Sequence, residues 1–128
     1  MTTPAYTLFL LDHIGAGNSS PFRAHLEWDG EPVLRTDLTE LLFTLFDRVS
    51  GNVINGHYNE DILALLNAGD LEYELDGEAD NILLRQDGKL EEHCILLTAK
   101  WAGSNRVAMW LIQFVVDPIP LPTAPVTP

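Results

Sequence analysis

The sequence is poor in cationic residues. It contains 7 Lys and Arg residues against 19 Asp and Glu residues, which gives a formal net charge of −12. Nucleic acids and anionic membranes bind proteins through cationic surfaces, so this charge argues against both as direct partners. It favours a cationic partner, above all a basic surface of another protein, although acidic residues also serve solubility or adaptation to salt.

Cysteine and long apolar runs are scarce as well. The single cysteine, Cys94, cannot form an internal disulfide, which is typical of a reducing compartment. The apolar run at 6–11 is too short for a membrane span, and no basic residue precedes it as in a signal peptide. We therefore expect a cytoplasmic protein. Its 128 residues, of which 46% are hydrophobic, suit one domain with a substantial core.

The hydrophobic pattern predicts an α+β fold. We expect an antiparallel or mixed sheet of about six to seven strands, with two helices at about 37–50 and 60–68 packed on one face. The first helix has apolar residues at helical spacing, and Asp37 and Asn59 suit the N-cap positions of the two helices. Gly51 follows the first helix where a glycine stop belongs.

The remaining segments predict strands. Runs of apolar residues, or of alternating polar and apolar residues, lie at 6–11, 22–28, 31–35, 71–75, 81–86, 89–101 and 106–116. The last run is apolar on both faces, so we expect it in the middle of the sheet and covered on both sides.

Two segments read as irregular. The Gly-, Asn- and Ser-rich residues 13–21 predict a surface loop. The tail 117–128 contains five prolines, so it should be extended or disordered. We therefore expect a single α+β domain over 1–116, followed by this tail.

No group of residues matches a catalytic, cofactor or metal motif. The Gly-Ala-Gly at 15–17 is followed by Pro21 rather than by a helix that could hold a phosphate. His93 and Cys94 are neighbours on a predicted strand, so their side chains point to opposite faces and cannot form a dyad. None of the four histidines lies at helical ligand spacing from another. We expect no catalytic site, no metal and no cofactor.

The strongest local feature is an acidic ladder, "DLEYELDGEAD" at 70–80, with an acid at every even position. It partly matches a calcium-binding loop that begins at Glu72, but Leu83 stands where the bidentate Glu is required. As a strand, the ladder would direct its acids to one face at intervals of about 7 Å, with the apolar residues toward the core. No Lys or Arg lies between Arg48 and Arg85, so any neutralising cation must come from another strand.

The sequence therefore predicts a non-enzymatic acidic interaction protein that blocks or regulates a basic protein, for example a nucleic-acid-binding protein or a nuclease. The acidic strip could imitate the charge spacing of a nucleic-acid backbone. The expected partner-binding residues are the acids and tyrosines of two segments: Tyr58, Glu60, Asp61, Asp70, Glu72, Tyr73, Glu74, Asp76, Glu78 and Asp80. Inhibitors carried by phages or mobile elements, and toxin antidotes, share this charge and size, which is an analogy only.

Two alternatives belong to other classes. One is a structural or assembly subunit of a phage particle or homo-oligomer, in which 106–116 and the proline-rich tail make subunit contacts. The other is a small-ligand-binding protein or an enzyme with a pocket in which acids and histidines converge.

Overall fold

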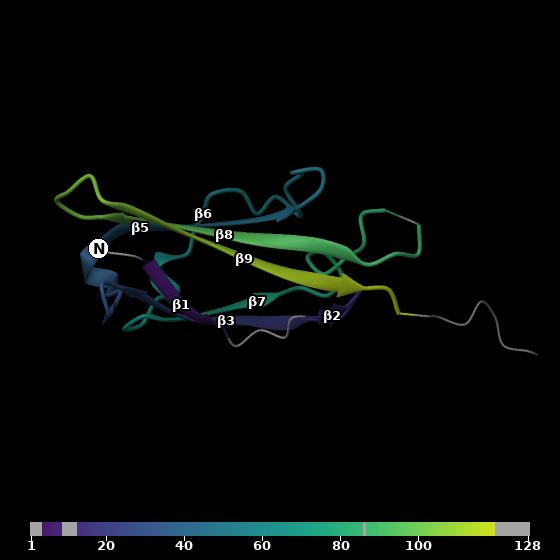
Figure 1. Cartoon of the computed structure of the whole chain (residues 1–128), viewed down its shortest axis with the longest axis horizontal. Coiled ribbons are helices and arrows are strands. Elements are labelled where there is room, and N and C mark those ends of the chain that lie inside the picture. Colours follow the sequence, from purple (N-terminus) through teal and green to yellow (C-terminus); the bar gives the residue numbers. More distant parts are fainter. Residues whose placement is uncertain (1–3, 9–12, 86, 120–128) are drawn as a thin grey trace, which may run out of the picture.

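The chain folds as two facing β-sheets (Figure 1), according to a computed structural model that describes residues 4–8, 13–85 and 87–119. Sheet A consists of β1 (Pro4–Leu8), β3 (Ser20–Trp28), β4 (Glu31–Pro32) and β7 (Asp70–Leu75). Sheet B consists of β2 (His13–Gly15), β9 (Val107–Asp117), β8 (Glu91–Trp101), β5 (Leu38–Asp47) and β6 (Glu60–Asp61), in this spatial order. The pairs are antiparallel, except that β2 runs parallel to β9.

Sheet A follows the alternation that its sequence predicts. Strand β3 is central and pairs with β1, β4 and β7. Phe22 and Leu26 of β3 point inward and are fully buried. Leu71 and Leu75 of β7 also point inward, and each is at most 2% exposed. Burial of such side chains stabilises each by about 1.5–3 kcal/mol, so these alternating residues determine which face of the strand turns inward.

Sheet B is built on three long strands. The odd-numbered residues of β5 and β8 and the even-numbered residues of β9 face the core. The inner face carries Leu41, Phe43 and Leu45 from β5, Ile95 and Leu97 from β8, and Trp110, Ile112 and Phe114 from β9. These side chains meet the inner face of sheet A in one hydrophobic core.

The predicted α+β fold is wrong, because neither predicted helix forms. The segment 37–50 contains β5, preceded by a single 3-10 turn at Arg35–Asp37. Its apolar residues fit a helical spacing, but they also occupy both faces of a strand, and its Phe and Thr residues favour β structure. Nine residues of β5 pair with β8, and this non-local pairing prevails over the local helical pattern.

The second predicted helix, 60–68, reduces to the two-residue strand β6 and a 3-10 turn at Leu63–Leu65. Asn59 and Ala68 have φ values of 49°, in the left-handed region, so neither residue belongs to a right-handed helix. The predicted strand at 81–86 is also absent from its described residues, 81–85, which form an irregular segment before β8.

Other expectations are corrected in detail. The predicted loop at 13–21 contains β2 and the start of β3. The run 106–116 forms β9, but its even-numbered side chains alone face the core, so it is not covered on both sides. Residues 9–11 of the first predicted strand, and residues 120–128 of the predicted tail, lie outside the described residues. No helix in the described part of the chain is long and apolar enough to cross a membrane.

Candidate functional site

The acidic ladder lies on the outer face of sheet A, and its first half is paired with an arginine and a histidine. Asp70 and Glu72 are exposed on β7, as expected. Their cross-strand neighbours on β3 are His25 and Arg23. His25 Nδ1 lies 2.8 Å from Asp70 Oδ1, and Arg23 Nη2 lies 3.4 Å from Glu72 Oε1. The partners of these acids therefore come from a strand about 45 residues away in sequence, and Arg23 supplies the positive charge.

The second half of the ladder keeps its charge. Glu74 lies opposite Pro21, and neither Glu74, Asp76 nor Glu78 forms an ion pair with a described residue. The Oδ1 atom of Asp76 accepts hydrogen bonds from the backbone amides of Glu78 and Ala79, so this acid also shapes the turn after β7.

Asp80 leaves the ladder altogether. It is only 2% exposed, and its Oδ1 accepts hydrogen bonds from Asn55 Nδ2 at 2.9 Å and from His57 Nε2 at 2.8 Å. The other ring nitrogen of His57 lies 3.0 Å from Glu60, which also accepts a hydrogen bond from the Tyr73 hydroxyl at 2.8 Å. The ladder therefore contributes Asp80 to an internal hydrogen-bond network and not to an exposed strip.

This network is locked by packing. The ring of Tyr73 stacks on Phe43 with the centroids 4.5 Å apart, and His57 meets Phe43 edge-on. Burial, together with the hydrogen bond to Glu60, raises the pKa of the Tyr73 hydroxyl, so this group stays a donor. Both nitrogens of His57 are engaged, so the ring has no free nitrogen to act on a substrate.

The two remaining predicted residues differ in environment. Tyr58 is 67% exposed, and its exposure agrees with the expectation from sequence. Asp61 is exposed on β6, but its Oδ1 accepts hydrogen bonds from the backbone amides of Leu41 and Leu63 and so helps to end the sheet.

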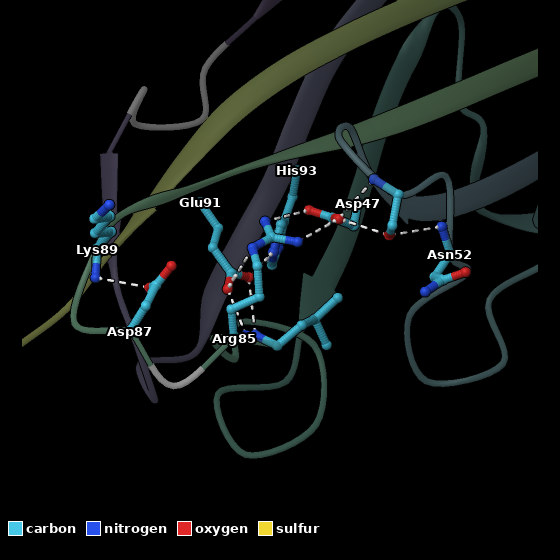
Figure 2. A network of polar contacts seen from close by, with 9 residues as sticks. Asp47, Asn52, Arg85, Asp87, Lys89, Glu91 and His93 are labelled. Atoms are coloured by element: carbon cyan, nitrogen blue, oxygen red, sulfur yellow. Dashed lines mark hydrogen bonds and ion pairs between the residues drawn. The ribbon is translucent and has the colours of Figure 1, made fainter.

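A second cluster of acids is buried near one end of sheet B (Figure 2). Asp47 is fully buried, and Arg85 Nη1 and Nη2 donate to its two carboxylate oxygens at 2.8 and 3.0 Å. Glu91 accepts hydrogen bonds from the backbone amides of Leu84 and Arg85 and lies 3.1 Å from His93 Nε2.

These contacts keep both acids ionised. The hydrogen bonds from Arg85 lower the pKa of Asp47, against the opposing effect of burial, and the Asp47 carboxylate in turn raises the pKa of Arg85. Burial opposes ionisation of Glu91, but the bonds from the backbone amides and from His93 outweigh it and lower its pKa. The cluster is an internal ion-pair network.

The same cluster satisfies the distance requirement of a metal site, since ligand atoms of Asp47, Glu91 and His93 lie within 4.8 Å of one another. However, the guanidinium of Arg85 already binds both oxygens of Asp47, and Glu91 is saturated by backbone amides. Because the chain supplies its own cation here, the arrangement does not support a metal centre.

Cys94 does not support nucleophilic catalysis. It lies on the face of β8 opposite His93, as the strand alternation predicts, and it is 1% exposed. Burial raises the pKa of its thiol, whereas a reactive cysteine requires a lowered pKa.

A site that the sequence interpretation missed lies where β8 turns into β9, at the left end in Figure 1. The rings of Trp28 and Trp101 approach to 5.3 Å between centroids at a tilt of 54°. The guanidinium of Arg106 lies over both rings, 5.3 Å from one centroid and 5.5 Å from the other. The two tryptophans therefore already hold a cation by cation–π contact.

Carboxylates border this pair. An open cavity of about 270 Å³ lies beside Arg106, and three acids line it without forming an ion pair with any described residue. We call the group the tryptophan corner: Trp28, Trp101, Arg106, Asp29, Glu31 and Asp37. The signal in the sequence is Trp28 directly before Asp29-Gly30-Glu31, an aromatic residue beside the acids of a predicted hairpin.

Comparison with known proteins adds no identity. Neither the protein-family models nor the curated proteins include a match to this chain.

Proposed function

We propose that the chain is a non-enzymatic interaction protein that binds a basic surface of another protein, and that an Arg or Lys side chain of this partner occupies the tryptophan corner. The observation that carries the proposal is the pair Trp28 and Trp101, which stacks a guanidinium beside three carboxylates that form no ion pair with a described residue.

The physical basis has two parts. A cation over a tryptophan face gains about 0.5–2 kcal/mol, and the gain is larger where water is excluded. The carboxylates of the corner carry three negative charges against the single positive charge of Arg106, so the field attracts a second cation. The unpaired acids Glu74, Asp76 and Glu78 at the opposite end of β7 add long-range steering toward the same kind of partner.

A non-enzymatic role agrees with how the titratable clusters are bonded. Both nitrogens of His57 and the carboxylates of Asp47 and Glu91 are engaged in hydrogen bonds within the chain. Groups that are mutually saturated stabilise the fold, and they are poorly placed to exchange protons with a substrate.

The first test uses a hexa-arginine peptide and its citrulline counterpart, which has the same shape without the charge. We expect the arginine peptide to shift the indole resonances of Trp28 and Trp101, and to bind more weakly as salt rises. The combined substitution Asp29→Asn, Glu31→Gln and Asp37→Asn should weaken binding at least about tenfold.

The matched control removes the same charge elsewhere, by Glu74→Gln, Asp76→Asn and Glu78→Gln, and should weaken binding less than about threefold. If both triple variants weaken binding equally, net charge explains the affinity and the corner is not the site. If the citrulline peptide binds as tightly as the arginine peptide, the proposal of a basic partner fails.

A further inference from the structure

The outer face of sheet B is apolar along β9, the strand whose sequence is apolar on both faces. Val107, Met109 and Leu111 of β9 point away from the core and are 46%, 59% and 50% exposed. Leu96 of β8 and Leu42 of β5 are partly exposed beside them. Exposed apolar groups that are contiguous rather than scattered mark surfaces that another molecule covers.

The register shows that this surface is continuous. Successive rows across β5, β8 and β9 are Glu40–Lys100–Val107, Leu42–Thr98–Met109, Thr44–Leu96–Leu111 and Phe46–Cys94–Gln113. The middle rows carry no charged residue. They form a mostly apolar strip over three strands, in which Thr44, Thr98 and Cys94 are themselves buried between larger exposed or partly exposed neighbours.

Two ion pairs close this strip at its ends, and each sums to zero charge. Lys100 Nζ lies 3.1 Å from Glu40 Oε1 at one end, and Arg48 Nη1 lies 2.8 Å from Glu92 Oε2 at the other. Over β5, β8 and β9 the strip is therefore electrically neutral, although the chain as a whole carries a net charge of −12 and the exposed Asp61 of β6 lies opposite Leu42 on the same face. Two copies of so acidic a chain repel each other wherever their carboxylates meet, and this face avoids that repulsion.

The charges at the two ends are also self-complementary. The acid Glu40 stands near one end of β5 and the base Arg48 directly follows its other end, and on β8 the order is reversed, with Lys100 and then Glu92. A two-fold axis through the Thr44 row, perpendicular to the strands, inverts the strand direction. It therefore places each acid of one copy opposite a base of the other.

We propose that a second copy of this chain packs face to face on the outer face of sheet B, about this two-fold axis. The two sheets would align as in a β-sandwich, with the apolar side chains of the middle rows interdigitating. The proposal accounts for the exposed apolar side chains of β9, and it is independent of the tryptophan corner.

The size of the strip sets the expected affinity. Four rows about 7 Å apart over three strands about 4.8 Å apart give a footprint of about 400 Å² per copy. Interdigitating side chains bury more area than the footprint, so the total approaches about 1,000–1,200 Å², the lower limit of specific interfaces. We therefore expect a reversible dimer with a dissociation constant in the micromolar range.

The first experiment measures mass by sedimentation equilibrium up to about 300 µM, where a micromolar dimer is populated. The wild type should self-associate, and the double variant Met109→Glu and Leu111→Glu should be monomeric. The control Leu65→Glu and Leu90→Glu makes the same chemical change at exposed leucines outside the strip and should still dimerise. A monomeric wild type at this concentration overturns the proposal, and so does a dimer that survives the first double variant.

The second experiment tests the two-fold arrangement by exchanging charges within each ion pair. Glu40→Lys with Lys100→Glu keeps the pair within the chain but opposes like charges across the interface, and should raise the dissociation constant about tenfold at low salt. Arg48→Glu with Glu92→Arg should do the same, and the quadruple variant should restore the wild-type affinity. If the quadruple variant is no tighter than the doubles, the proposed symmetry is wrong.

Discussion

The two sheets distribute charge and hydrophobicity in opposite ways. Sheet A places Asp70 and Glu72 outside and Leu71 inside, as expected for a sheet with one wet face. Sheet B places Asp47 inside near one end, whereas Met109 of β9 lies on the outside.

The difference shows what each placement requires. Asp47 remains ionised inside sheet B because Arg85 and the backbone amide of Ser50 donate to its oxygens, so the lost hydration is replaced by hydrogen bonds. An acid on the outside of sheet A needs no such partner, since water solvates it, and its ion pairs are weak additions. The apolar outer face of sheet B has no equivalent compensation in one copy.

The largest expected effect comes from removing the buried acid. Asp47→Ala leaves Arg85 and Ser50 without the carboxylate that accepts their hydrogen bonds. We expect the free energy of unfolding, measured by urea denaturation, to fall by about 3 kcal/mol. The matching variant on sheet A, Asp70→Ala, removes an exposed acid that is paired with His25, and should cost less than about 0.5 kcal/mol.

Equal losses for the two variants would contradict the comparison, because they would mean that the inner and outer ion pairs contribute alike.

Acid titration separates the two kinds of carboxylate further. The pKa values of Asp47 and Glu91 are lowered in the folded protein, so below about pH 4.5 the unfolded chain takes up protons that the folded chain does not. Stability that is present above this pH is therefore lost as the pH falls. Urea midpoints measured from about pH 6 to 3 should fall steeply for the wild type and less steeply for Asp47→Asn.

Glu72→Gln, which removes an outer carboxylate, serves as the control for net charge. A curve as shallow as that of Asp47→Asn would show that the steepness comes from the acidic composition as a whole.

The same contrast explains how far the sequence could predict the fold. Strands β3 and β7 alternate polar and apolar residues, so their burial was predictable from a period of two. Strand β5 has apolar residues on both faces, as in Leu42 beside Leu41 and Phe43. Its sequence therefore does not alternate between polar and apolar residues, and its apolar residues fit the spacing of a helix instead. Only its pairing with β8, about 50 residues away, decides between the two, and a local pattern cannot contain that information.

The candidate site shows the same limit. The outward direction of Asp70, Glu72 and Glu74 was predictable from strand alternation, but their partners on β3 depend on the pairing register. The tryptophan corner joins Trp28 to Trp101, which are adjacent only because both strands end at the same end of the sandwich. Its acids were visible in the sequence, and its aromatic pair was not.

The smallest expected effect tests the charges on the outer face of sheet A. The same substitution, Glu→Lys, should change the free energy of unfolding in opposite directions at two neighbouring positions of this face. Glu74 lies opposite Pro21 and between acids, so Glu74→Lys removes a repulsion and should raise the free energy of unfolding by about 0.3 kcal/mol. Glu72 lies opposite Arg23, so Glu72→Lys replaces an attraction by a repulsion and should lower it by a similar amount. Thermal midpoints at low salt would measure both, and high salt should abolish the difference because the charges are exposed. If both variants change in the same direction, the cross-strand pairs do not set the energetics of this face.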